Sequence, residues 1–74
     1  YDDQNLADSL KKWRQQKAAE RGIHPLAVLP GHILADICRS KPSSVRELGR
    51  IQWFGEKRTN LYGEEIIDII RNSS

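Results

Sequence analysis

Apolar residues recur every three or four positions along most of the 74-residue chain, and this is the period of an α-helix. The first such run predicts a helix from about residue 3 or 5 to Arg21. Gly22 follows it directly and suits the left-handed cap that ends many helices. At 100° per residue, a narrow arc forms the predicted buried stripe of this helix, and it consists of Leu6, Leu10 and Trp13.

The helical period is interrupted at residues 23–29, which contain Pro25 and predict an extended connector. Pro30 is a favourable first residue for a second helix, which we expect to reach about Ser40. The predicted buried side of this second helix consists of Ile33, Leu34, Ile37 and Cys38.

A third, short helix is predicted after Lys41-Pro42, where the proline breaks the chain. Ser44 and Glu47 have the spacing of a capping box, in which each side chain satisfies an unpaired backbone amide at the helix start. The apolar positions of this helix are Val45, Leu48 and Ile51.

The last third of the chain predicts a turn at residues 52–55, a fourth helix to about Tyr62 and a fifth helix after Gly63. A broad apolar arc indicates that the fifth helix packs at the centre of the fold, and it consists of Ile66, Ile67, Ile69 and Ile70. The whole pattern predicts an all-α, compact five-helix bundle that forms a single domain.

The composition narrows the ways in which so short a chain can be stabilised. Cys38 is the only cysteine, so no disulfide can form within the chain. The spacing of Cys38, His24 and His32 matches no zinc pattern, and helix packing must therefore suffice. An unpaired cysteine suits a reducing cytoplasm or nucleus, and no run of apolar residues is long enough to span a membrane. Because the chain begins at Tyr1 without a methionine, we expect a fragment of a larger protein.

A string of spaced positions resembles one known domain family. The string consists of Leu10-Lys11-Lys12-Trp13-Arg14, Ala18, Pro25, Val28, Leu34, Ile37, Pro42, Leu48, Ile51, Gly55 and Tyr62-Gly63. In order and spacing it resembles the helicase-and-RNase-D C-terminal (HRDC) domain, over a core of about residues 5–71. The resemblance implies a five-helix domain with a helix-hairpin-helix-like turn, attached to a RecQ-type DNA helicase or, as the alternative, to an RNase D-type exonuclease. It also implies an auxiliary nucleic-acid-binding or interaction module without catalysis of its own.

Three positions depart from the pattern of that family. The turn after the third helix commonly has the form Ile-x-Gly-x-Gly, whereas here Trp53 replaces the first glycine and Gly55 keeps the second. Leu26 stands where many members have an aromatic residue, and Lys17 stands where an apolar residue is common.

Two cations after the turn are the first candidates for a nucleic-acid site. Lys57 and Arg58 follow Gly55 at the start of the predicted fourth helix, where backbone amides and side-chain cations could hold a phosphate together. The alternative is a solvated helix face. Two further basic groups could flank a groove that accepts a strand or a duplex backbone. The first lies on the first helix and consists of Arg14, Lys17 and Arg21, and the second lies before the turn and consists of Lys41, Arg46 and Arg50.

Trp53 leaves three possibilities open. An exposed indole could stack on an unpaired base, or it could anchor a protein interface together with Phe54 and Leu26. The third possibility is that the indole folds back and completes the small core.

The net charge of +2 by itself decides nothing about the partner. Neither histidine stands in a sequence context that pairs it with an obvious nucleophilic residue, and no carboxylate cluster resembles a two-metal site. We therefore expect neither catalysis nor a cofactor. The expected function is weak, salt-sensitive binding of single-stranded or branched DNA by a monomeric domain, in the bacterial cytoplasm or the eukaryotic nucleus. The alternative is a regulatory module that contacts another domain of the parent helicase or a protein partner.

Overall fold

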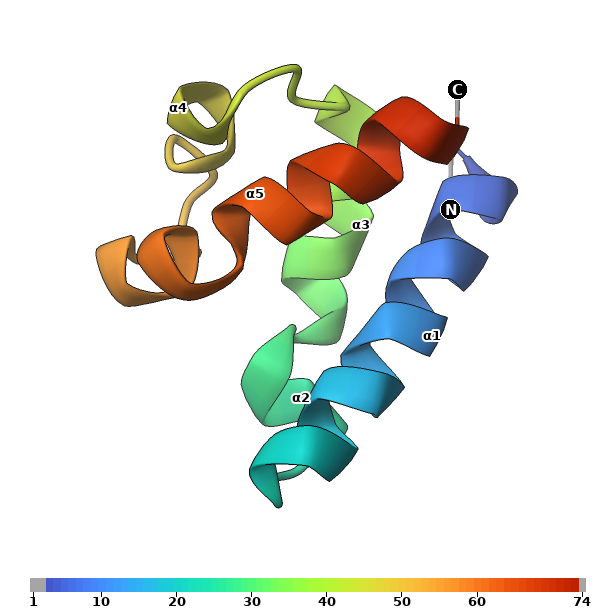
Figure 1. Ribbon diagram of the computed structural model, residues 1–74. Helices are drawn as coiled ribbons and strands as arrows, with labels where there is room; N and C mark the ends of the chain where they lie inside the picture. The colour runs from blue at the N-terminus through green and yellow to red at the C-terminus, as the bar shows by residue number, and fades with distance from the viewer. Residues whose placement is uncertain (1–2, 74) are drawn as a thin grey trace.

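The computed structural model describes residues 3–73, without the side chain of residue 73, and all regular elements in this part of the chain are helices (Figure 1). The predicted all-α class is therefore confirmed. The helices are α1 (Gln4–Arg21), α2 (Pro25–Val28), α3 (Gly31–Ser40), α4 (Val45–Leu48) and α5 (Glu56–Ser73).

The first helix begins and ends as the sequence predicts. Asp3 is its N-cap, and a carboxylate oxygen of Asp3 accepts a hydrogen bond from the Leu6 amide at 3.1 Å. Gly22 takes the left-handed conformation with φ of 65°, and its amide donates to the carbonyl of Ala18. The sequence therefore fixes both ends of α1 by local hydrogen bonding.

The prediction of an extended connector at residues 23–29 is wrong, because Pro25 opens the short helix α2. Proline is compatible with the first position of a helix, where its missing N–H has no partner to lose. His24 caps the turn, since its Nδ1 accepts a hydrogen bond from the Leu26 amide at 3.1 Å. The proline therefore starts a helical turn at this point.

The capping box at α4 forms in an altered version. The hydroxyl of Ser44 accepts the Glu47 amide at 3.2 Å, as predicted. The Glu47 carboxylate, however, contacts Ser43 in place of Ser44, and it accepts both the amide at 2.7 Å and the hydroxyl at 2.9 Å. These hydrogen bonds from Ser43 lower the pKa of Glu47 below its ordinary value.

The predicted break at Gly63 is also wrong, because residues 56–73 form one continuous helix. Gly63 is buried in this helix against α4. A Cβ atom added to Gly63 would lie 3.0 Å from Cγ1 of Val45, closer than side chains normally pack. The glycine therefore permits the close approach of α4 to α5 and does not end a helix.

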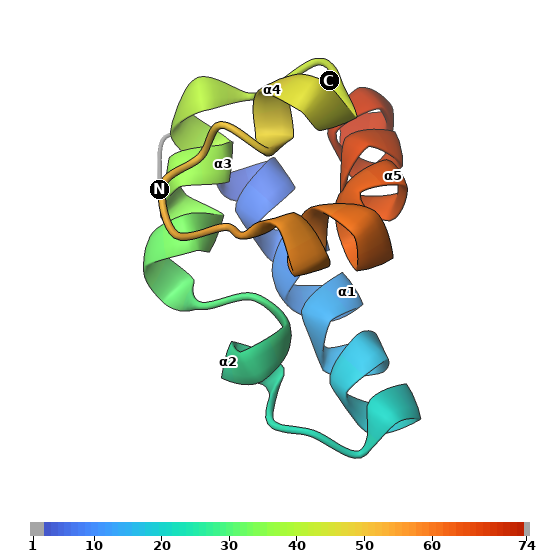
Figure 2. The same cartoon turned by 90° about the vertical axis from the view of Figure 1, so that its left-hand side faces the viewer.

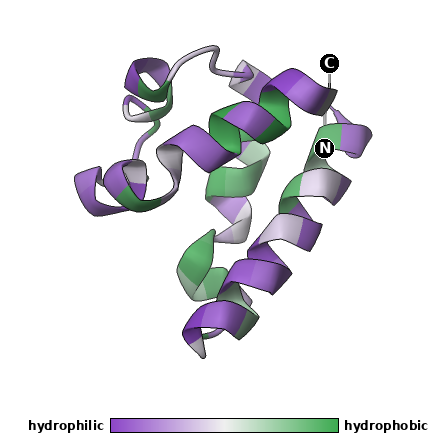
Figure 3. Ribbon diagram, viewed as in Figure 1, coloured by the Kyte–Doolittle hydropathy of each residue, from purple (hydrophilic) through white to green (hydrophobic). Residues whose placement is uncertain are grey.

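The core lies between α1, α3 and α5, and Figures 1 and 2 place α2 and α4 at opposite ends of α3. Apolar residues concentrate on α3 and on the second half of α5, whereas α1 is largely polar outside its buried stripe (Figure 3). The ring of Trp13 on α1 meets that of Tyr62 on α5 edge to face, at 5.4 Å between centroids. The buried apolar residues are Leu6, Ala7, Leu10, Trp13, Ala18, Val28, Leu29, Ile33, Leu34, Ile37, Cys38, Leu48, Phe54, Tyr62, Ile66, Ile67 and Ile70.

Candidate nucleic-acid interface

The turn between α4 and α5 has glycine-like backbone geometry at two positions. Gly55 has φ of 88°, and Trp53 has φ of 70°, in the left-handed region that bulky residues rarely adopt. Trp53 occupies the position where the HRDC pattern has glycine. The backbone of the turn thus keeps the conformation that glycine would allow, although the side chain has changed.

Of the two aromatic residues of this turn, one is buried and the other is exposed to solvent. The side chain of Phe54 is completely buried and anchors the turn in the core. Phe54 therefore cannot belong to an exposed contact patch, contrary to the sequence-based expectation. Trp53 is 73% exposed, which excludes the alternative that its indole completes the core.

Arg58 fastens the turn to α2. Its guanidinium donates to the carbonyl oxygens of Trp53 at 3.3 Å, Phe54 at 3.2 Å and, across the chain, Ala27 at 3.5 Å. Several of its N–H groups are therefore engaged by backbone oxygens. Arg58 contributes its positive charge to the surface, while its two Nη atoms donate hydrogen bonds within the fold.

Arg21 approaches the same place from the end of α1. One Nη atom donates to the Tyr62 hydroxyl at 2.9 Å, and the guanidinium carbon lies 5.7 Å from the centroid of the Tyr62 ring. Both contacts orient the guanidinium, and the cation–π contact adds to its attachment. Since Tyr62 itself packs against Trp13, the core fixes the position of this surface cation.

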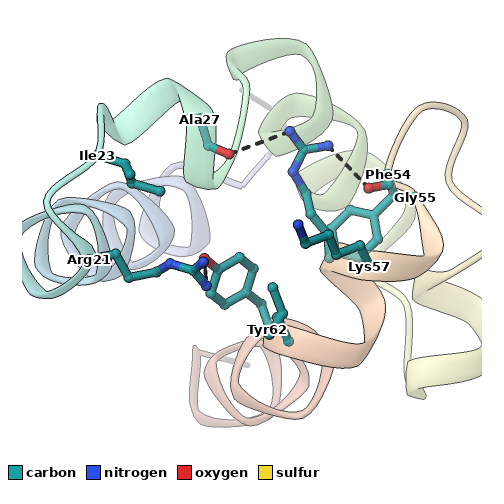
Figure 4. Close-up of a pocket in the computed structure, with 9 residues that line it drawn as sticks. Arg21, Ile23, Ala27, Phe54, Gly55, Lys57 and Tyr62 are labelled. Atoms are coloured by element: carbon teal, nitrogen blue, oxygen red, sulfur yellow. Dashed lines mark hydrogen bonds between the residues drawn. The ribbon is translucent and has the colours of Figure 1, made fainter.

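These residues surround a surface cavity of about 360 Å³, which we call the α1–α5 cavity. Figure 4 shows Arg21 on one side of it, Lys57 with Phe54 and Gly55 on the other, and Tyr62 between them. The lining contains three cations and no carboxylate. The lining residues are Arg21, Ile23, Ala27, Phe54, Gly55, Lys57, Arg58, Leu61 and Tyr62.

Four of the nucleic-acid-binding candidates thus come together at one cavity, although they are separated by up to 37 positions in the chain. Gly55, Lys57 and Arg58 come from the turn and the first turn of α5, and Arg21 comes from the last turn of α1. Within residues 3–73 no ion pair engages Lys57 or Arg21. Their charges are therefore available to a ligand.

The remaining basic candidates lie elsewhere, and the predicted ridge along α1 does not form as a unit. Lys17 pairs with Glu65 at 2.8 Å and with Glu20 at 3.8 Å, and the hydrogen bond from Glu65 raises the pKa of Lys17. Arg14 donates to the carbonyl oxygen of Leu29 at 2.8 Å. Each of these cations is thus held by a partner within the fold.

The second predicted basic group is likewise dispersed. Lys41 forms an ion pair with Asp3 at 3.1 Å. Arg46 and Arg50 are exposed, and neither lines the α1–α5 cavity. Two basic groups that flank a common groove, as the sequence suggested, are not present in this part of the chain.

Sequence reasoning missed the apolar part of the cavity. Ile23 is 40% exposed and Leu61 is 47% exposed, and both lie on its lining. Leu61 does carry a signal, since it is an apolar residue outside the buried arc of α5. Ile23 carries none, because its place on the cavity lining depends on how the chain folds back after α1.

Two other features are absent from the described residues, a cluster of metal ligands and a helix that could span a membrane. No three histidine, cysteine, aspartate or glutamate side chains in the described segment converge on a point where a metal ion could bind. Between residues 3 and 73, no helix has both the length and the apolar character needed to cross a bilayer.

The fold and the cavity define a small all-α domain with a surface cavity lined by cations. A family model described as the HRDC domain matches residues 3–70. The chain therefore belongs to the HRDC domain family, whose members are non-catalytic accessory domains and generally bind nucleic acid in helicases and RNase D. No curated protein and no solved structure matches the chain significantly.

Proposed function

We propose that this HRDC domain is an auxiliary module of a RecQ-type DNA helicase that binds single-stranded or branched DNA through the α1–α5 cavity. The observation that carries the proposal is the lining of this cavity, in which three cations meet without a carboxylate. The other basic candidates differ, since Lys17 and Lys41 are paired with acidic side chains, while the exposed Arg46 and Arg50 do not line this cavity.

The proposed mechanism is electrostatic. Lys57 and Arg21 contact backbone phosphates and displace condensed counterions, while Arg58 adds its charge from the cavity lining. Such contacts read no sequence, and an isolated domain should bind with a dissociation constant of roughly 10⁻⁴–10⁻⁶ M at physiological salt. Tethering to the parent protein would make this weak contact useful by raising the local concentration of the domain at DNA.

The test is titration of labelled single-stranded and forked DNA at low and at moderate salt. Lys57→Glu should weaken binding strongly, because Lys57 is exposed and lines the cavity. Lys12→Glu is the matched control, since it makes the same charge change at an exposed position about 180° around α1 from Arg21. The proposal is wrong if the wild-type domain does not bind at low salt, if its binding ignores salt, or if both variants bind equally.

Arg58 is unsuitable for this test, although the sequence makes it as prominent as Lys57. Its guanidinium donates to three backbone carbonyls, so charge reversal would disturb the turn as well as the cavity. Loss of DNA binding in such a variant would therefore not separate a phosphate contact from a folding defect.

A second candidate function is a contact with another domain or a protein partner, and the exposure of Trp53 favours it. Trp53 is 73% exposed and Leu26 is 50% exposed, and Arg58 links the two segments that carry them. Tryptophan is a frequent anchor of protein interfaces. If Trp53→Ala leaves DNA binding unchanged but Lys57→Glu abolishes it, the indole is available for such a partner. If Trp53→Ala weakens DNA binding more than Lys57→Glu does, base stacking and not electrostatics makes the main contribution to affinity.

A further inference from the structure

The α1–α5 cavity has features that a continuous DNA backbone does not need. It has a volume of about 360 Å³, within the range of roughly 300–1,000 Å³ that is typical of sites for small ligands. The fully buried side chain of Phe54 and the buried ring of Tyr62 form part of its lining. A hollow of this kind suits a group at the end of a chain better than a strand that passes over the surface.

The charges of the cavity also favour a terminal group. A phosphodiester in a DNA strand carries one negative charge, whereas a terminal phosphate monoester carries about −1.5 to −2 at neutral pH. The three cations of the lining therefore match a monoester better than a single diester. Arg21 is oriented by the Tyr62 hydroxyl at 2.9 Å, which leaves other N–H groups of its guanidinium for an anion.

The apolar lining lies beside these cations. Ile23 and Leu61 are each almost half exposed on the lining, where they can contact the sugar or the base that carries the phosphate. An ion such as inorganic phosphate has no apolar part and would leave this surface uncovered. The arrangement therefore selects an anion attached to a flat or apolar body.

From these observations we infer that the α1–α5 cavity binds the phosphorylated end of a nucleic-acid strand. Arg21 and Lys57 hold the terminal phosphate monoester, and Ile23, Leu61 and the edge of Tyr62 contact the terminal nucleoside. This inference rests on the proposed function, because it takes the partner to be DNA, and it adds that the domain distinguishes a phosphorylated end from a hydroxyl end.

The experiment compares three labelled single-stranded oligonucleotides of one sequence, with a 5′-phosphate, a 3′-phosphate or no terminal phosphate. We expect one of the phosphorylated oligonucleotides to bind about five- to tenfold more tightly than the unphosphorylated one, because hydrogen bonds between charged groups are strong. Which of the two gains affinity identifies the end that is bound. Lys57→Gln should abolish the gain, whereas Lys12→Gln should keep it.

Equal binding of all three oligonucleotides, or a gain that survives Lys57→Gln, would overturn the inference. If the unphosphorylated strand still binds with salt sensitivity and depends on Lys57, the proposed function stands and only the terminal site is wrong. If no oligonucleotide binds, both are wrong. A phosphoserine peptide that displaces the phosphorylated oligonucleotide at equal concentration would overturn the assignment to nucleic acid.

Discussion

Replacing Trp53 by glycine and by alanine tests the geometry of the turn that supports the cavity. Both substitutions remove the same exposed indole, so the difference between them isolates the backbone conformation at φ of 70°. A left-handed conformation costs a residue with a Cβ about 1–2 kcal/mol. Glycine avoids this cost but loses about 0.5–1 kcal/mol more conformational freedom on folding than alanine. Trp53→Gly should therefore be more stable than Trp53→Ala by about 0.5–1 kcal/mol.

The assay is urea or thermal unfolding followed by the fluorescence of Trp13. In both variants Trp13 is the remaining tryptophan, and it is buried against Tyr62 in the folded domain. The predicted difference corresponds to about 2–8 °C in melting temperature for a domain of this size. Gln52 provides the matched control, because its φ is not positive and Gln52→Gly should be less stable than Gln52→Ala. If Trp53→Ala is as stable as Trp53→Gly or more stable, residue 53 does not have the left-handed backbone conformation.

The other predictions concern stability away from the cavity. Gly63→Val should destabilise the domain by about 1–3 kcal/mol because its side chain meets Val45, and Val45→Ala in the same chain should recover part of the loss in urea unfolding. Equal costs with and without Val45→Ala would argue against close packing of α4 on α5. The pKa of Asp3 is lowered by the Leu6 amide and then by Lys41, and that of Glu47 by Ser43, so both carboxylates stabilise the fold when ionised. The contribution of these two carboxylates to the free energy of unfolding should be complete above about pH 5 and should be lost as the pH falls through their lowered pKa values. The double variant Asp3→Asn, Glu47→Gln should therefore lose less stability on acidification than the wild-type domain. An unchanged decline would show that other groups cause it.

The sequence predicts the parts of the fold that depend on local signals. The ends of α1 follow from the side chain of Asp3 and the glycine at position 22, and the first half of the capping box follows from Ser44. The apolar stripes on α1, α3 and α5 are predicted by helical periodicity, and their residues are buried except for Ile69, which is partly buried and packs against the core.

The errors arise where one residue has two physical roles. Pro25 can end an extended segment or open a helix, and only the cap from His24 and the packing of α2 on α1 select the helix. Gly63 can break a helix or admit a neighbour, and the contact with Val45 decides for the second role. In both cases the packing of another helix selects between the two roles, and the sequence around the residue does not show this packing.

The candidate site is predictable only in part for the same reason. The sequence places Lys57 and Arg58 beside Gly55, but it does not show that Arg58 is occupied by backbone carbonyls. It also groups Arg21 with Lys17 on one face of a helix. The structure separates these two, because Glu65 pairs with Lys17 while Tyr62 directs Arg21 to the cavity.

The most direct test of the central claim is the salt dependence of single-stranded DNA binding by Lys57→Gln and Lys12→Gln. If Lys57 contacts one phosphate, its loss should reduce the slope of log K against log salt by roughly 0.7, the value expected per phosphate contact on a single strand. Lys12→Gln should retain the wild-type slope, since Lys12 lies on the opposite face of α1 from Arg21. Identical slopes for the two variants would contradict a phosphate site at the α1–α5 cavity.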